Sequence, residues 1–351
     1  MAGDRSNPDK PIVAHSPSFT AADARRIASE RYGRPGTARE LTSERDQNFL
    51  IEPSDAGSAI VLKIANAREE RALLEAQQQV LAVLGQRGVA TPRVFCTTSG
   101  DALTEISGED GRRHFVWAVT YLPGVLLADL SHRSTQLLED VGAAIGKLTA
   151  VLREVHSPAL EREFNWDLQR AAERVGMFDG VRERVERYVQ PCAGALYRAV
   201  IHNDLNDHNI LIADGARVSG VLDFGDMLYG WRVSDLAIAA AYMMLDADDP
   251  LAVLAALVRG VRRECPLEDA ELEVVFELAC LRLALSASIA VEQQQARPDN
   301  AYLGVSQGAI QRTLPRLLRV PHELAVAVAR DAAGLEPVAR SARVREWIRA
   351  N

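Results

Sequence analysis

Apolar residues alternate with polar ones over short stretches in the first third of the chain and recur with helical spacing over most of the remainder. Thr20 and Gly33 flank a helical pattern over 21–32, and a threonine N-cap with a closing glycine predicts a short helix there. A second helical pattern covers 69–84. Strands are predicted where the period is two, within 39–42, 48–52, 58–64, 92–97 and 115–122.

The pattern changes beyond the Pro123-Gly124 step. Helical spacing predicts long helices at 136–156, 168–188, 233–245, 251–262, 269–295 and 309–318, with a further helical run near the C-terminus. One short island, 202–224, has strand patterns instead. We therefore expect an α+β protein in which a small β-rich lobe precedes a larger, mostly helical lobe.

Three segments follow from these patterns. Residues 1–19 are polar, proline-rich and without periodicity, so we expect a flexible N-terminal arm. We expect an N-lobe over 20–122 and a C-lobe over 123–351, with a hinge at Leu122–Gly124.

The strand-rich island holds the residues with the clearest chemistry. His202, Asp204 and Asn209 have the spacing H-x-D-x4-N, and Asp223-Phe224-Gly225 begins fourteen residues after Asn209. Phosphoryl transfer requires a carboxylate that orients the attacking hydroxyl and oxygen ligands for magnesium ions. Asp204 is therefore the candidate catalytic residue, and Asn209 and Asp223 are the candidate metal ligands. His202 fits a structural role in the loop better than that of a proton carrier.

Apolar strands at 210–212 and 218–222, joined by a turn at 213–217, predict a hairpin that brings the two ends of this motif together. The segment resembles the catalytic loop and metal-binding triplet of the aminoglycoside phosphotransferase superfamily, which includes choline, ethanolamine, homoserine and hydroxylysine kinases. It is also similar to the protein-kinase signature set.

The resemblance covers residues 37–310. The segments most similar to hydroxylysine kinases are ERDQNF at 44–49, IHNDLNDHNIL at 201–211 and LDFGDMLYG at 222–230. It implies a protein-kinase-like two-lobed fold, ATP or GTP as phosphoryl donor, and Mg²⁺ as the metal.

A lysine in the N-lobe is the candidate ligand of the nucleotide phosphates. Strand alternation places Ala59, Val61 and Lys63 on one face. We expect Lys63 to reach the phosphates and Val61 to pack against the base; the alternative is a surface lysine on an edge strand. The family pairs this lysine with a glutamate on the next helix, and here the inward position holds Gln77, with Glu70 as the alternative.

No G-x-G-x-x-G loop is present, which argues against a typical protein kinase. The turn that contains Ser43 and Asn48 is predicted to contact phosphate through polar side chains and backbone amides, unless it is only a solvated hairpin turn. The resemblance implies that the backbone near Tyr121 and Leu122 faces the purine.

The acceptor side is expected in the C-lobe. Asp207 and Asp226 are candidates to hold an amine, and the alternative for both is hydrogen bonding to loop amides. Trp231 could cover an alkyl chain or belong to the core. Asp235 is predicted to cap a helix and brace a loop rather than bind a ligand.

Arg282 and Ser286 share one face of an apolar helical stretch. A buried arginine needs a partner, which is either a structural carboxylate of the protein or the carboxylate of an amino-acid substrate. Tyr302 is a candidate for the same wall of the acceptor site.

Composition and charge bear on the partners and the localisation of the protein. A net charge of −8 argues against a nucleic-acid partner. The four cysteines form no C-x-x-C pair, and the N-terminus has no apolar signal segment, so we expect a cytoplasmic protein. The nearly apolar stretch 236–245 is too short to span a membrane. The oligomeric state stays open, a homodimer included.

The resulting hypothesis is a magnesium-dependent kinase of a small acceptor that carries a hydroxyl and an amino group, hydroxylysine-like by resemblance. An antibiotic kinase acting on an aminoglycoside or macrolide is the alternative within the same fold. A nucleotide-binding regulatory pseudokinase is the alternative of another class.

Overall fold

The computed structural model describes residues 15–43, 45–54, 57–176, 178–296, 306–339 and 341–350. The described chain divides into two compact units. Unit 1 contains the described residues up to 86 together with 91–122, and unit 2 contains 87–90 and the described residues from 123 onward.

Unit 1 is built on one antiparallel sheet whose strands follow the order β1-β2-β3-β6-β4, with β5 also paired to β6. The strands are β1 (Gly36–Leu41), β2 (Gln47–Pro53), β3 (Ile60–Ile64), β4 (Val94–Phe95), β5 (Thr104–Ser107) and β6 (Arg113–Thr120). The helix α1 (Ala21–Tyr32) has the predicted caps: Thr20 forms a capping box with Asp23, and Gly33 adopts a left-handed φ of 60°.

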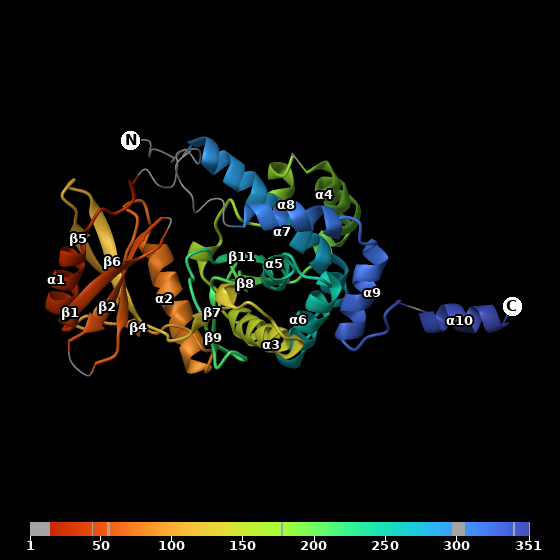
Figure 1. The fold of residues 1–351 in the computed structure, drawn as a ribbon, viewed down its shortest axis with the longest axis horizontal. Helices are drawn as coiled ribbons and strands as arrows, with labels where there is room; N and C mark the ends of the chain where they lie inside the picture. The colour runs from red at the N-terminus through yellow and green to blue at the C-terminus, as the bar shows by residue number, and fades with distance from the viewer. Residues whose placement is uncertain are drawn as a thin grey trace. The chain divides into compact units, whose positions relative to one another are not determined.

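The core of unit 1 lies between α1 and one face of the sheet. Ile27 of α1 packs with Phe49 of β2 and Leu62 of β3, and all three side chains are at most 2% exposed. Because side chains alternate along a strand, Val61 and Lys63 face the other side. The second helix, α2 (Arg71–Gln86), lies on that other side of the sheet (Figure 1).

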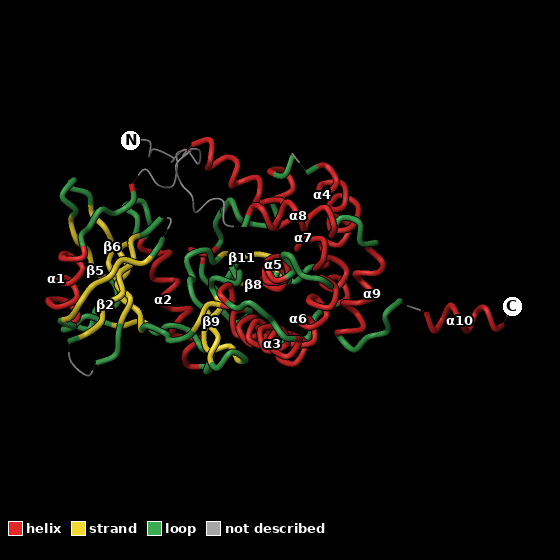
Figure 2. The backbone as a smooth tube through the Cα atoms, in the orientation of Figure 1, coloured by secondary structure: helices red, strands yellow, loops and turns green. Residues whose placement is uncertain are grey.

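Unit 2 contains two small sheets within a helical body (Figure 2). The first has the order β10-β9-β7, and the second pairs β11 with β8. The strands are β7 (Val125–Leu126), β8 (Arg198–Ile201), β9 (Ile210–Ala213), β10 (Arg217–Val221) and β11 (Leu228–Trp231). The mixture of a β-rich unit and a helix-rich unit is the predicted α+β architecture.

The helices of unit 2 are α3 (Thr135–Leu152), α4 (Asp179–Arg184), α5 (Ser234–Met243), α6 (Pro250–Glu264), α7 (Asp269–Ala296), α8 (Gln307–Leu317), α9 (His322–Ala332) and α10 (Ser341–Ala350). Every residue of α5 is buried. Helices α3 and α6 approach closely because glycines face each other: a Cβ at Gly260 would lie 2.1 Å from the carbonyl oxygen of Glu139.

The predicted helix over 168–188 is wrong in its first half, whereas residues 179–189 are continuously helical. The segment contains a 3₁₀ turn at Ala171–Arg174, the short α4 and a π-helical stretch at Val185–Val189. Leu168 reaches the core from a turn, whereas Val181 and Val185 reach it from one continuous helical stretch. Packing of a winding segment can therefore imitate the spacing of one helix.

One described helix, α7, is long and apolar enough by length and composition to cross a membrane, over Asp269–Glu292. Its most apolar window is 94% buried inside the protein. A helix buried to this extent belongs to the core of the protein.

Buried charges join α7 to α9 and to α4. Glu277 accepts hydrogen bonds of 2.7 Å from Arg184 and contacts His322 at 2.9 Å. His322 also contacts Glu273 at 3.2 Å and stacks on Tyr188. Burial lowers the pKa of His322, but the hydrogen bonds with the two glutamates outweigh burial and raise the pKa above its ordinary value of 6.5.

We expect His322→Gln to make the unfolding free energy less dependent on pH above neutrality. A histidine with a raised folded-state pKa stabilises the protein fully below its unfolded-state pKa, and the contribution is lost as pH rises through the folded-state value. The wild type should lose about 1.5–3 kcal/mol more than the variant between about pH 6 and about pH 9, the range for hydrogen bonds to charged groups. Urea unfolding at both pH values measures this difference, and equal losses would contradict the assignment.

Candidate active site

Strand pairing places two loops of unit 2 side by side. The segment predicted to be catalytic, residues 202–209, runs from β8 to β9 and is called the catalytic loop; the segment predicted to bind metal, residues 222–227, runs from β10 to β11 and is called the metal loop. Ile201 pairs with Leu228, and Ile210 pairs with Val221, so both ends of one loop are fixed to both ends of the other. The predicted hairpin of β9 and β10 is confirmed.

Leu222 joins the two loops directly, immediately before Asp223. Its amide donates to the carbonyl of Asn209 at 2.8 Å. Its carbonyl lies 2.8 Å from Nε2 of His202 and must accept, so the imidazole carries its proton on Nε2. Nδ1 of His202 then accepts from the amide of Asp204 at 3.2 Å. The fully buried His202 has the predicted structural role.

Asp235 holds the start of the catalytic loop. Its two carboxylate oxygens accept from the amides of His202 at 3.0 Å and of Asn203 at 2.8 Å. This confirms the predicted loop brace, whereas no capping hydrogen bond from Asp235 to the start of α5 accompanies it. Asn203 has a φ of +65°, a left-handed conformation that asparagine tolerates better than most residues.

The carboxylate of Asp204 is held on both oxygens. Oδ1 accepts from Nη2 of Arg282 at 2.7 Å and from Nδ2 of Asn206 at 3.0 Å. Oδ2 accepts from Nδ2 of Asn209 at 2.8 Å. The side chain is 20% exposed, so it is fixed in position yet still reachable.

Negative charge gathers around Asp204. Burial, together with the charges of Asp226 and Asp223, raises the pKa of Asp204 to about 7, although the nearby Arg282 acts in the opposite direction. The electrostatic effect of Asp223 and Asp226 on Asp204 shows that the three carboxylates occupy one neighbourhood. The sequence motif is thus assembled in space.

Asn209 and Asp223 offer the oxygen donors that Mg²⁺ prefers. Asn209 uses its amide nitrogen for the carbonyl and the carboxylate of Asp204, both at 2.8 Å, which directs its amide oxygen away from Asp204. Asp223 is exposed at a φ of +56°. The described residues contain no group of three or more His, Cys, Asp or Glu side chains that could hold a metal ion. A magnesium ion held by one or two protein oxygens and by nucleotide phosphates fits these residues.

The acceptor-side candidates lie in different surroundings. Asp207 accepts a 2.6 Å hydrogen bond from Arg133, so its carboxylate is already engaged by a cation of the protein. Asp226 is half-buried next to Asp204. Trp231 is 7% exposed within β11, and this burial supports its alternative reading as a core residue. Tyr302 lies outside the described residues.

The structure gives Arg282 the first of its two predicted partners, a carboxylate of the protein. Its guanidinium pairs with Asp204 at 2.7 Å, and its side chain is only 3% exposed. The carboxylate that it needs is therefore supplied by the protein, and the predicted grip on an acceptor carboxylate is not the arrangement observed. Helical spacing placed Arg282 on a buried face but could not identify its partner, 78 residues away.

In unit 1, the candidate phosphate ligands lie on neighbouring strands. Lys63 of β3 pairs in register with Asn48 of β2, and its Nζ lies 5.3 Å from the ring centroid of Trp117. The Oδ1 atom of Asn48 is buried and has no hydrogen-bond partner among the residues that the structure describes. Such an atom is expected to find a partner, so Asn48 remains a good candidate for binding a ligand.

The other nucleotide candidates are spread over unit 1. Ser43 is exposed in the turn after β1, and Val61 is half-buried beside Lys63 on β3. Gln77 lies on the buried face of α2, whereas Glu70 is exposed just before that helix, and both stay candidates for the partner of Lys63.

Tyr121 and Leu122 follow β6. The amide of Tyr121 donates to the carbonyl of Ala59 at 3.0 Å, and the Tyr121 side chain is 43% exposed. The placement of Tyr121 and Leu122 beside the purine remains a prediction.

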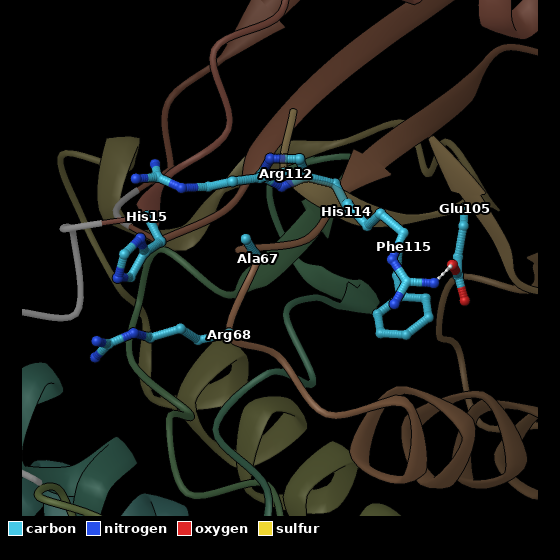
Figure 3. Close-up of a pocket in the computed structure, with 8 residues that line it drawn as sticks. His15, Ala67, Arg68, Glu105, Arg112, His114 and Phe115 are labelled. Carbon is cyan, nitrogen blue, oxygen red and sulfur yellow. Dashed lines mark hydrogen bonds and ion pairs between the residues drawn. The ribbon is translucent and has the colours of Figure 1, made fainter. Parts of the chain in front are cut away.

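A separate basic cavity of about 410 Å³ lies in unit 1 (Figure 3). Its walls include Arg68, Arg112 and Arg113, with His15 and His114. Arg113 contacts Glu105 at 3.4 Å and Arg112 contacts Asp110 at 3.1 Å, so part of its positive charge is matched by neighbouring carboxylates. None of the residues predicted to bind nucleotide lines this cavity.

Sequence reasoning missed several residues that hold the two loops. Arg133 binds Asp207, and Arg162 donates to the carbonyls of Gly225 at 2.7 Å and Met227 at 3.0 Å. Trp166 lies 4.4 Å from the guanidinium carbon of Arg282. Each stands in a segment without a recognisable motif, so only the packing reveals its role.

Comparison with known proteins identifies the family. Residues 37–272, more than half of the chain, match the model described as the phosphotransferase enzyme family. The chain belongs to this family. The hydroxylysine kinase of Mus musculus is 32% identical to this phosphotransferase over 321 residues, covering 81% of this chain and 85% of the mouse protein. The homoserine kinase of Pseudomonas aeruginosa strain UCBPP-PA14 is 27% identical over 235 residues, covering 61% and 69%.

Solved structures support the fold of the phosphotransferase. An amicoumacin kinase in complex with AMP-PNP and Ca²⁺ superposes with a TM-score of 0.68 at 17% identity, covering 87% of this chain and 96% of that one. The predicted protein-kinase-like fold and the resemblance to this superfamily are confirmed. So is the prediction of an enzyme that transfers phosphoryl groups to an alcohol group.

Proposed function

We propose that this phosphotransferase is a magnesium-dependent, cytoplasmic kinase that moves the γ-phosphoryl group of ATP or GTP to the hydroxyl of a hydroxylysine-like amino acid or amino alcohol. The observation that carries the proposal is the setting of Asp204. Its carboxylate is fixed on both oxygens, remains partly exposed, and lies beside Asn209 and Asp223.

Asp204 would act on the acceptor. In a phosphoryl transfer, the hydroxyl oxygen of the acceptor forms a bond to the γ-phosphorus as the bond to the β–γ bridging oxygen breaks. A fixed carboxylate orients that hydroxyl and accepts its proton. Because Arg282 and Asn209 already hold the carboxylate, it needs little reorganisation when the acceptor binds.

Asn209 and Asp223 would hold Mg²⁺, which supplies charge neutralisation for the phosphates when bound. His202 and Leu222 serve this pair by fixing the distance between the loops that carry them. On the nucleotide side, Lys63 would bind the phosphates as a point charge, with Asn48 as a hydrogen-bonding neighbour.

An amine on the acceptor would suit the charge of this site. Asp226 adds a second, half-buried carboxylate next to Asp204, and a positively charged ammonium group is attracted to such a pair. The relatives support this class of acceptor, since hydroxylysine and homoserine are both amino acids with a side-chain hydroxyl.

Two alternatives are tested by the same experiment. An aminoglycoside or other antibiotic kinase would share the fold, as does the amicoumacin kinase among the solved structures. A regulatory pseudokinase would bind nucleotide without turnover. Retention of Lys63, Asp204, Asn209 and Asp223 favours an active enzyme, because a pure binding module does not need all four.

We expect turnover of 5-hydroxylysine in a panel that also contains homoserine, ethanolamine, choline and kanamycin, assayed with ATP and with GTP for nucleoside diphosphate release. The kcat/KM for hydroxylysine should exceed that for kanamycin by about 10²-fold or more, the discrimination expected when buried polar groups of a site lose their partners. Omission of Mg²⁺ should abolish turnover. Preference for kanamycin would establish the antibiotic alternative, and nucleotide binding without turnover of any acceptor would establish the pseudokinase.

A further inference from the structure

Arg282 is a charged residue in a place that strongly disfavours charge. It lies within α7, between Leu281 and Leu283, and neither of these neighbours is measurably exposed. Its own side chain is 3% exposed. A buried guanidinium costs free energy unless hydrogen bonds and an opposite charge compensate for its lost hydration, so its partners indicate why it is there.

Those partners converge on the catalytic loop. Nη2 donates to Oδ1 of Asp204 at 2.7 Å, and Nη1 donates to the carbonyl of Asn203 at 3.4 Å. Nε donates to the hydroxyl of Tyr242 at 3.4 Å. The guanidinium carbon lies 4.4 Å from the ring centroid of Trp166 and 5.6 Å from that of Tyr242. An arginine enclosed in this way has little freedom to move.

These contacts fix the orientation of the Asp204 carboxylate. Arg282 holds Oδ1, and Asn209 holds Oδ2 from within the loop. Because Oδ1 accepts from Arg282 and Asn206 and Oδ2 accepts from Asn209, rotation of the carboxylate about its bond to Cβ is restricted. Oδ2 accepts one hydrogen bond, from Asn209, and so keeps a second lone-pair direction, and the 20% exposure of the side chain leaves room there for an acceptor hydroxyl.

We propose that Arg282 is a positioning residue, which holds the carboxylate of Asp204 in the orientation that receives the acceptor hydroxyl. This proposal rests on the proposed kinase function and extends it to a residue outside the catalytic loop and the metal loop. Arg282 acts through Asp204 and makes no contact with the acceptor. Tyr242 and Trp166 support it by keeping the guanidinium in place.

The test is a comparison of Arg282→Ala and Arg282→Lys with the wild type, using an acceptor that the panel shows to be turned over. We expect Arg282→Ala to lower kcat by about 10²-fold, the usual cost of a misplaced reacting group, with the nucleotide KM unchanged. The kcat of Arg282→Lys should lie between those of the wild type and Arg282→Ala, because an ammonium keeps the charge but lacks the planar fork of the guanidinium. Guanidinium ion at concentrations well below those that denature proteins should restore part of the kcat of Arg282→Ala and leave Arg282→Lys unaffected.

Arg184→Ala is the matched control. Arg184 also forms a partly buried ion pair with α7, through Glu277 at 2.7 Å, but it contacts neither loop. The variant Arg184→Ala should have a lower melting temperature than the wild type, as Arg282→Ala should, but when folded it should keep the kcat of the wild type. Circular dichroism confirms that each variant is folded at the assay temperature.

Several outcomes would overturn the proposal. An unchanged kcat in folded Arg282→Ala removes the positioning role. A raised acceptor KM with kcat retained shows instead that Arg282 grips the acceptor. Equal losses of kcat in Arg184→Ala and Arg282→Ala, without rescue by guanidinium ion, show a purely structural role. An enzyme inactive toward the whole panel contradicts the proposed function itself, and the positioning role then fails with it; this outcome is visible in the wild type alone.

Discussion

Asp204→Asn should lower kcat by about 10²- to 10⁴-fold, the range that a positioned general base contributes. Asparagine has the same shape and keeps an oxygen for Arg282, but it cannot accept the proton of the acceptor hydroxyl. The affinity for nucleotide should stay close to that of the wild type, because Asp204 is assigned to the acceptor and not to the phosphates. Steady-state kinetics and calorimetric titration with a non-hydrolysable nucleotide measure the two quantities.

Asp246→Asn is the control for this prediction. Asp246 also pairs with an arginine, Arg312, through contacts of 2.6 and 3.0 Å, but on an exposed surface of unit 2. The same loss of a carboxylate there should leave kcat unchanged. If Asp204→Asn turned over the acceptor at the wild-type rate, Asp204 would have no catalytic role and the proposed mechanism would fail.

Asp223→Asn should remove the dependence of nucleotide binding on Mg²⁺. Asparagine suits the left-handed φ of +56° at this position, so the backbone should be preserved, whereas alanine would add strain. Loss of the carboxylate should weaken nucleotide binding in the presence of Mg²⁺ by about 10²-fold, at least as much as the loss of an outer-shell partner of a metal. Binding without Mg²⁺ should change little. Calorimetry with and without the ion gives both values.

Asp214→Asn is the matched control for Asp223. Asp214 has a φ of +52° and an exposed side chain in the turn between β9 and β10, so the chemical change and the backbone conformation are the same. Its variant should bind the nucleotide with the wild-type dependence on Mg²⁺. A Mg²⁺-dependent affinity retained in Asp223→Asn would assign the metal to other residues.

Asp214 and Asp223 show what the local sequence around a residue can and cannot predict about its role. Both follow apolar strands and both adopt left-handed conformations. Asp214 is exposed in a hairpin turn, whereas Asp223 directly follows Leu222, through which His202 and Asn209 hold the metal loop. In the sequence, the Phe224-Gly225 pair after Asp223 and its spacing to the H-x-D-x4-N motif separate the two.

The sequence by itself determined what local chemistry and short-range pairing control. The caps of α1 at Thr20 and Gly33 were predictable because both act within one helix turn. The β9–β10 hairpin and the grouping of Asp204, Asn209 and Asp223 were predictable because a hairpin joins neighbours in the chain. The family followed from the same residues.

Tertiary structure alone decided the partners of the charged side chains. Arg282 faces Asp204 across 78 residues, and Arg133 faces Asp207 across 74. Periodicity showed that Arg282 is buried, but burial is compatible with any opposite charge that the fold brings near. The irregular course of residues 168–176 before α4 had the same cause, since core contacts from several elements override local helical preference. Interactions between distant segments depend on how the helices pack, and the order of residues along the chain does not encode that packing locally.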